Sequence, residues 1–139
     1  MKRLLLLLWL LPLFAFQTDT SAKLIGKWVG EDQTKAMGYI LFDNEGYVTI
    51  GIGNETYGGK EFTMNGQKGQ MTYEVNADVD PIEIDFIVKK FDDEQEDRLT
   101  CLAKFINDDQ MLFIMGYEAD ETANFDEDSE QTILLTREK

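Results

Sequence analysis

The sequence predicts an all-β domain, an eight-stranded antiparallel up-and-down barrel. Runs rich in aromatic and β-branched residues recur along the chain and are separated by Gly, Asn and Asp, at the spacing typical of an all-β barrel or sandwich. No segment shows a helical hydrophobic period of useful length. The 139 residues, 43% of them apolar, suffice for one packed domain. Closing the sheet would remove exposed strand edges.

The first 22 residues are predicted to be a secretory signal peptide, followed by a single domain over residues 23–139. A basic tip (residues 1–3) precedes the uncharged apolar run Leu4–Phe16, which is shorter than the ~20 residues of a membrane-spanning helix. Cleavage is expected after Ala22 or after Ala15, and a retained anchor is the alternative. No Cys follows the run, so a lipoprotein anchor at this site is excluded. We expect a secreted or periplasmic protein with no membrane span in its mature form.

The N-terminal half of the domain contains four predicted strands. The turn Asp43-Asn44-Glu45-Gly46 joins two of them into a hairpin, because Gly tolerates positive φ. Asn54–Gly59 is predicted as a loop with two adjacent glycines, and Glu61–Met64 as no more than a brief pairing. The four strands are Lys23–Gly30, Gly38–Phe42, Tyr47–Gly53 and Gly69–Ala77.

The C-terminal half contains the clearest strand of the chain, Ile82–Phe91. Every second residue from Ile82 to Val88 is apolar, with Glu83 and Asp85 on the other face and Ile87 as the exception. This period of two favours a half-buried antiparallel strand. The remaining predicted strands are Arg98–Ile106, Met111–Glu118 and Gln131–Arg137.

The net charge of the chain, -14, limits its partners. So acidic a surface repels nucleic-acid phosphate and anionic lipid, and neither is an expected partner. Two acidic loops stand out, Asp92–Asp97 and Glu118–Glu130. They either attract a basic protein partner or form ordinary solvated surface charge.

No catalytic constellation is found in the sequence, and we expect no enzymatic activity. The chain has no His, and Cys101 is its only cysteine, so zinc chemistry, Ser–His chemistry and an activated thiol are all disfavoured. Cys101 is interpreted as a buried structural thiol. The acidic loops lack the spacing and central Gly of an EF-hand calcium loop, so we expect no metal and no cofactor.

The segment Gly26-Lys27-Trp28 on the first predicted strand resembles the Gly-x-Trp motif of lipocalins. In that fold the Trp closes one end of the barrel and a basic residue of the last strand packs over its ring. The resemblance therefore implies a structural latch of Gly26, Trp28 and Arg137, in which cation–π attraction is worth ~1 kcal/mol or somewhat more.

Further motifs in the same order along the chain resemble the bacterial lipocalin-like domains, a set of exported small barrels. The resemblance covers roughly Leu24 to Arg137. The motifs are a Gly-Tyr hairpin (Gly38-Tyr39 to Gly46), a Tyr-x-Val strand (Tyr73-Glu74-Val75), an Ile-x-Ile-Asp strand (Ile82-Glu83-Ile84-Asp85) and an Asn-Phe-Asp element (Asn124-Phe125-Asp126).

Two functions are compatible with such a barrel. One is binding of a small apolar ligand inside it, since an eight-stranded barrel is just wide enough to be filled by side chains or to hold one small ligand. The other is a protein-interaction or inhibitor module that acts through the acidic loops around a filled core. The expected ligand-lining positions, which equally well serve only to fill the core, are Trp28, Phe42, Ile50, Tyr73, Phe86 and Phe105.

Overall fold

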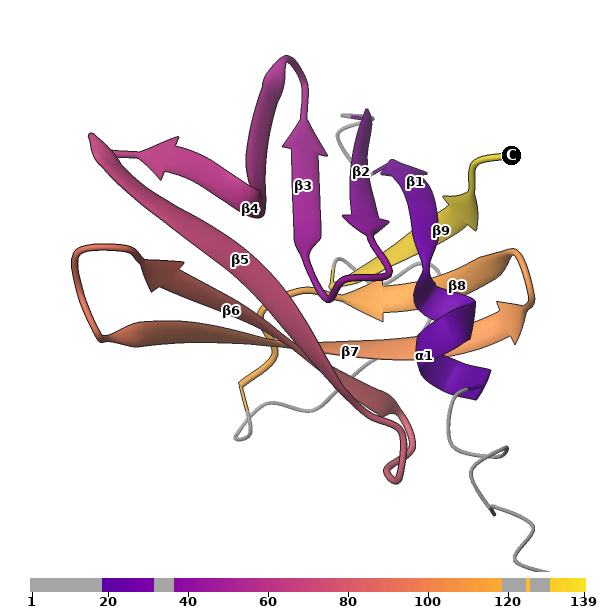
Figure 1. Cartoon of the computed structure of the whole chain (residues 1–139). Coiled ribbons are helices and arrows are strands. Elements are labelled where there is room, and N and C mark those ends of the chain that lie inside the picture. The colour runs from indigo at the N-terminus through magenta and orange to yellow at the C-terminus, as the bar shows by residue number, and fades with distance from the viewer. Residues whose placement is uncertain (1–18, 32–36, 119–124, 126–130) are drawn as a thin grey trace, which may run out of the picture.

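The computed structural model describes residues 19–31, 37–118, 125 and 131–139. The strands form a closed antiparallel barrel in which each pairs with the next and the last pairs with the first (Figure 1). The elements are α1 (Asp19–Leu24), β1 (Gly26–Glu31), β2 (Met37–Phe42), β3 (Val48–Ile52), β4 (Glu55–Met64), β5 (Gln67–Asn76), β6 (Ile82–Lys90), β7 (Glu96–Asn107), β8 (Gln110–Ile114) and β9 (Thr132–Arg137).

The described barrel has nine strands, so the expected number of eight is wrong. The additional strand is β4, which occupies the expected loop Asn54–Gly59 and the residues after it. Gly58 and Gly59 both have positive φ (101° and 84°), and the register with β5 shifts between Gly59 and Phe62. The strand bends there, so that its first half pairs with β3 and its second half with β5. Because this bulge interrupts the period of two, the strand cannot be recognised from alternation.

The first strand begins later than expected, because Asp19–Leu24 forms the short helix α1. Leu24, at its end, is fully buried. The chain then turns through Gly26, whose φ of +137° is unfavourable for other residues. No helix among the described residues is long and apolar enough to cross a membrane.

The barrel interior is a packed apolar core made by alternate residues of the strands. Phe42, Phe86 and Phe113 follow one another across it, with ring centroids 6.0 Å and 6.2 Å apart. The buried core cluster is Leu24, Trp28, Ile40, Phe42, Val48, Met71, Ile84, Phe86, Cys101, Ala103, Met111, Phe113 and Leu135.

Four further residues are buried outside this cluster: Ile87, Leu102, Leu112 and Ile114. Leu102 pairs with Ile114 across the ladder between β7 and β8. Their neighbours along each strand, such as Cys101 and Phe113, face the core, so these side chains face the outer side of the sheet. Burial on both sides explains why Met111–Ile114 of β8 is an unbroken apolar run rather than an alternating one.

The strands differ in length and in how far they extend from the barrel. In Figure 1 the β4–β5 and β6–β7 hairpins project well beyond the barrel that β1–β3 help to enclose. The far half of β4 pairs only with β5, and the first residues of β7 pair only with β6. We call the end of the barrel from which the β4–β5 and β6–β7 hairpins extend the mouth. The other end is closed by the residues described next.

Candidate functional site

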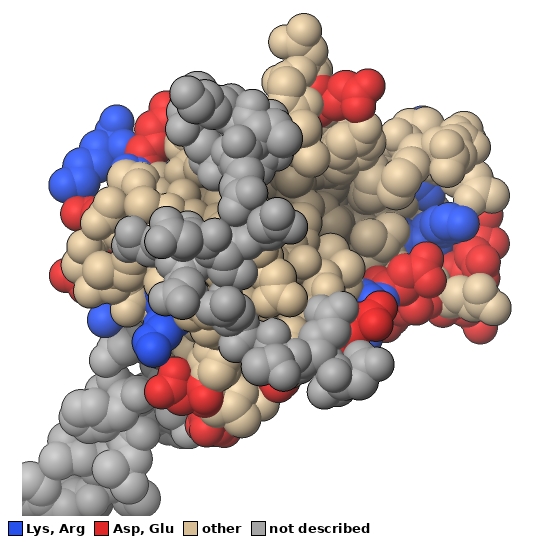
Figure 2. Space-filling view, turned by 180° about the vertical axis from the view of Figure 1, so that it is seen from behind, with Lys and Arg blue, Asp and Glu red and all other residues tan. Residues whose placement is uncertain are grey.

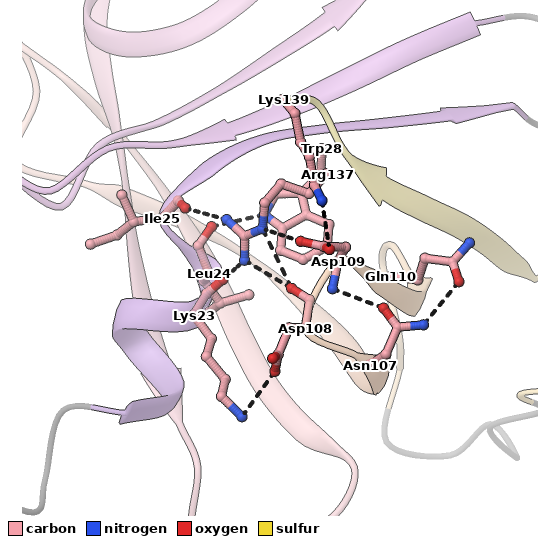
Figure 3. Close-up of polar contacts among 10 residues, drawn as sticks. All are labelled: Lys23, Leu24, Ile25, Trp28, Asn107, Asp108, Asp109, Gln110, Arg137 and Lys139. Carbon is pink, nitrogen blue, oxygen red and sulfur yellow. Dashed lines mark hydrogen bonds and ion pairs between the residues drawn. The ribbon is translucent and has the colours of Figure 1, made fainter.

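The closed end of the barrel is organised by Arg137, the last residue of β9. Its guanidinium carbon lies 4.3 Å from the centre of the Trp28 ring, so the planar cation stacks on the indole face. Its Nη1 donates a hydrogen bond of 2.6 Å to the carbonyl of Ile25, and its Nη2 donates to the carbonyl of Lys23 (Figure 3). One side chain thus joins the first and the last strand of the barrel to the segment before β1.

Two neighbouring acids complete the surroundings of Arg137. Its Nε and Nη2 lie 3.4 Å and 3.3 Å from the carbonyl oxygen of Asp108. The Asp109 carboxylate lies 3.5 Å from Nε. The turn between β7 and β8 is therefore tied to the same guanidinium as the N-terminal segment, which makes use of the several donors that only Arg offers in one plane.

Trp28 and Gly26 complete the latch predicted from the sequence. Trp28 is fully buried, and its indole N–H donates a 2.8 Å hydrogen bond to the carbonyl of Leu24. A Cβ at Gly26 would lie 2.8 Å from Nη1 of Arg137, which is closer than such atoms approach. Gly26 therefore leaves room for the guanidinium. These contacts give Trp28 a structural place rather than a place in a ligand site.

A small apolar cavity lies inside the mouth, with a volume of about 150 Å³. Strands β1, β2 and β3 contribute three glycines to its wall. Neighbouring side chains pack directly on two of them: a Cβ at Gly30 would lie 2.7 Å from Leu135, and one at Gly51 would overlap the Tyr39 ring. The lining residues are Gly30, Gly38, Tyr39, Ile40, Ile50, Gly51, Ile52, Met115, Ile133 and Leu135. Apart from the Tyr39 hydroxyl, no side chain among them can hydrogen-bond, so the cavity suits an apolar guest.

Of the six expected ligand-lining residues, Ile50 alone lines this cavity. Trp28, Phe42 and Phe86 are fully buried in the core, and Tyr73 and Phe105 pack against it. Tyr73 also donates a 2.9 Å hydrogen bond to the carbonyl of Asp43, and burial followed by the Asp43 charge raises its pKa. These large rings fill the core, and the cavity lies beside them between Ile40, Ile50 and Ile133.

Sequence reasoning missed the glycines and the Met115, Ile133 and Ile52 side chains of the cavity. The available signal was the row of glycines on neighbouring strands: Gly38 pairs with both Gly30 and Ile52, and Gly51 with Tyr39. These glycines are far apart in the sequence. They are seen to lie beside one another only once the pairing of the strands is known.

Cys101 has no reactive environment. It is fully buried, and burial raises the pKa of its thiol to about 12. The part of the chain that the structure describes contains no group of three or more His, Cys, Asp or Glu residues able to hold a metal ion. Most of the predicted acidic loop Glu118–Glu130 lies outside the described residues, so this finding does not extend to it.

The sequence matches no protein-family model and no curated protein. Among solved structures, the fold is similar to the crystal structure of Treponema pallidum Tp0751 (pallilysin), with a TM-score of 0.50 and 13% sequence identity. The likeness covers 88% of this chain and 85% of that one. At this identity it supports the closed β-barrel fold alone, and membership of the lipocalin-like domains stays a prediction.

Proposed function

We propose that the chain is an exported lipocalin-like barrel protein, without enzymatic activity, that binds a small apolar molecule at its open end. The observation that carries the proposal is the apolar cavity of about 150 Å³ between Ile40, Ile50 and Ile133. An apolar cavity of this size stays dry and accepts one benzene-sized ring. A larger apolar molecule would place one ring in it and extend into the mouth. Its wall is open toward the mouth, where Ile52 is 56% exposed.

A fluorescence titration with the neutral apolar dye N-phenyl-1-naphthylamine tests this function. We expect saturable binding that Ile133→Phe weakens at least tenfold, because the larger ring occupies the cavity. Leu134→Phe is the matched control, since Leu134 is the next residue and is 38% exposed; it should bind as the parent does. Absence of a saturable signal in the parent protein would overturn the proposal.

Export is proposed from the leader sequence, residues 1–22. The three carbonyls that tie the N-terminal segment to the latch belong to Lys23, Leu24 and Ile25. Removal of residues 1–22 would keep these three residues, although it would remove most of α1. The mass of the protein recovered from the exported fraction gives the cleavage site, and recovery of the full-length chain from the cell interior would contradict export.

A second candidate function is supported by the loop between β6 and β7. Phe91 is 51% exposed there, and Asp92, Asp93 and Glu94 beside it are also exposed. An exposed ring among carboxylates fits a basic protein partner with an apolar pocket. Capture of such a partner should be lost at high salt and in Phe91→Ala; salt-insensitive capture would argue against this function.

A further inference from the structure

The inner face of the sheet at the mouth changes from apolar to charged along its length. The register places residues of β5, β6 and β7 side by side in rows that face the barrel axis. Nearest the core the row is Val75, Ile84 and Cys101, and the next is Tyr73, Phe86 and Leu99. Farther out come Met71, Val88 and Asp97, and then Gly69 and Lys90.

Away from the core, the side chains of this inner face also become more exposed to solvent. Cys101 is fully buried, whereas Leu99, two residues away on the same face, is 41% exposed. On β4, Phe62 pairs with Gly69 and Met64 with Gln67, so both also face inward, and Met64 is 42% exposed. The mouth therefore presents apolar side chains to solvent on a concave surface.

A second cavity, of about 500 Å³, lies at the far end of this face. It is lined by Met64, Asn65, Gln67, Val88, Lys90 and Asp97. Figure 2 shows the surface hollowed between the uncharged tip at the top and the charged lobe at the right, with uncharged residues in the hollow. Val88 lies beside Asp97 and lines this cavity together with Lys90, so apolar and charged side chains meet on one face of the sheet.

Lys90 and Asp97 are the charged residues that the register of β5, β6 and β7 places on the inner face. Neither forms an ion pair with a residue that the structure describes, which is also true of the outer-face residues Glu83, Lys89 and Lys104. Elsewhere on the outer face, Arg98 lies 3.2 Å from Glu74 and 3.3 Å from Asp85. Since Val88 pairs with Asp97, Lys90 stands diagonally to Asp97 on the inner face, at roughly 7–8 Å between backbones. Both side chains are exposed, so a ligand can bring an opposite charge to each of them.

We propose that the mouth binds a single-chain amphiphile with a zwitterionic head group. The anionic group of the head pairs with Lys90 and its cationic group with Asp97, while the chain lies along Met64, Val88 and Leu99 toward the apolar cavity. A purely anionic head would satisfy Lys90 but would face Asp97 and a protein of net charge -14. A purely cationic head would face Lys90. This inference rests on the proposed apolar-ligand function.

Displacement of bound N-phenyl-1-naphthylamine by four monomeric amphiphiles with the same dodecyl chain tests the head group. The four are dodecylphosphocholine, dodecyl sulfate, dodecyltrimethylammonium and dodecyl maltoside, each kept below its micelle concentration. We expect dodecylphosphocholine to displace the dye at a concentration at least tenfold lower than any other. Lys90→Gln and Asp97→Asn should each abolish this preference.

The exchange variant Lys90→Asp with Asp97→Lys keeps both charges and should restore the preference lost in the single variants. Lys89→Gln and Glu96→Gln are the outer-face controls, because these residues pair with each other one step along the strands, and they should leave the preference intact. Each variant must also bind the dye as the parent does, which shows that the barrel is folded.

The outcomes separate the two proposals. Equal displacement by all four amphiphiles, or by none, overturns the zwitterionic head group while dye binding still supports the apolar cavity. Failure of the dye to bind the parent overturns both. Sedimentation with phosphatidylcholine vesicles without displacement by monomeric dodecylphosphocholine also overturns the inference, because it assigns binding to a membrane surface rather than to one molecule in the mouth.

Discussion

Arg137 stacks on Trp28 at 4.3 Å, although the two residues lie at opposite ends of the described domain. The same guanidinium donates hydrogen bonds to the carbonyls of Lys23 and Ile25. Because Trp28 is fully buried beneath it, the pair seals one end of the barrel. The opposite end keeps the cavity, so stability and binding are assigned to different ends of the molecule.

Trp28→Ala should lower the free energy of unfolding by about 3–5 kcal/mol, as large-to-small core substitutions do. The change leaves a cavity and removes the hydrogen bond to Leu24. Denaturant unfolding followed by circular dichroism measures the loss. Phe91→Ala is the control, since Phe91 is 51% exposed and surface changes are usually within about 0.5 kcal/mol. A loss below about 1 kcal/mol for Trp28→Ala would remove Trp28 from the latch.

Arg137→Lys keeps the charge but should cost about 2 kcal/mol of unfolding free energy. An ammonium group cannot stack on the indole as a plane. Its three donors leave a single nitrogen, whereas Arg137 reaches Lys23, Ile25 and Asp108 from three separate nitrogens. Lys139→Gln is the matched control at the same carboxyl end of the chain. Lys139 is paired with Asp109 at 3.2 Å but is exposed, so its loss should cost below about 1 kcal/mol. Equal losses in the two variants would contradict the special role of Arg137.

Gly58→Ala should destabilise the barrel by about 2 kcal/mol or more. Gly58 has a φ of +101°, and a Cβ there would lie 2.4 Å from both the Met71 side chain and the carbonyl of Val48. Gly53→Ala is the control: its φ of +60° is also positive, but no atom lies within 4 Å of the added carbon. It should cost about 1 kcal/mol for backbone strain alone. If the two variants had the same unfolding midpoint, the bend in β4 would not be tightly packed.

The Cys101 thiol should make stability fall with rising pH in the alkaline range. Burial raises its pKa to about 12 in the folded protein, whereas the unfolded chain loses the proton near about pH 8.5. Between these values the folded state binds more protons, so stability is complete below about pH 8.5 and is lost progressively toward pH 12. The loss from this group is roughly 1 kcal/mol per pH unit.

The difference between the parent and Cys101→Ala isolates this effect, because other groups that titrate there are common to both. Denaturant unfolding at several pH values from 8 to 11 should show the two proteins converging as the pH rises. A constant difference over that range would mean that the thiol is not kept protonated by the fold. Reaction of Cys101 with a thiol reagent should likewise require unfolding.

The barrel class could be predicted because most strands alternate. In Ile82–Phe91 the expected inward residues Ile84 and Phe86 are in the core, and Val88 packs against it. Ile87, the exception to the alternation, faces outward and is nonetheless 6% exposed. The pattern therefore predicts which face is inner, and it cannot predict what covers the outer one.

The expected number of strands and most of the expected lining residues fail for different physical reasons. The strand β4 is hidden because positive φ at Gly58 and Gly59 breaks the period. The cavity is hidden because apolar rings and apolar cavity walls have the same sequence pattern, and only register shows that Gly30, Gly38 and Gly51 meet at its wall. Lys90 could have been noticed, since alternation from Val88 places a charge on the apolar face.

The latch also sets an order on folding. β1 pairs with β9, and the register joins Trp28 with Arg137 and Glu31 with Leu134. β1 is synthesised first but its partner β9 is synthesised last. The barrel therefore cannot close until both strands are available. Contacts of such long sequence separation form slowly. A chain shortened to residue 130 should lack the cooperative unfolding transition of the intact protein, since its remaining strands would form an open sheet with two unpaired edges.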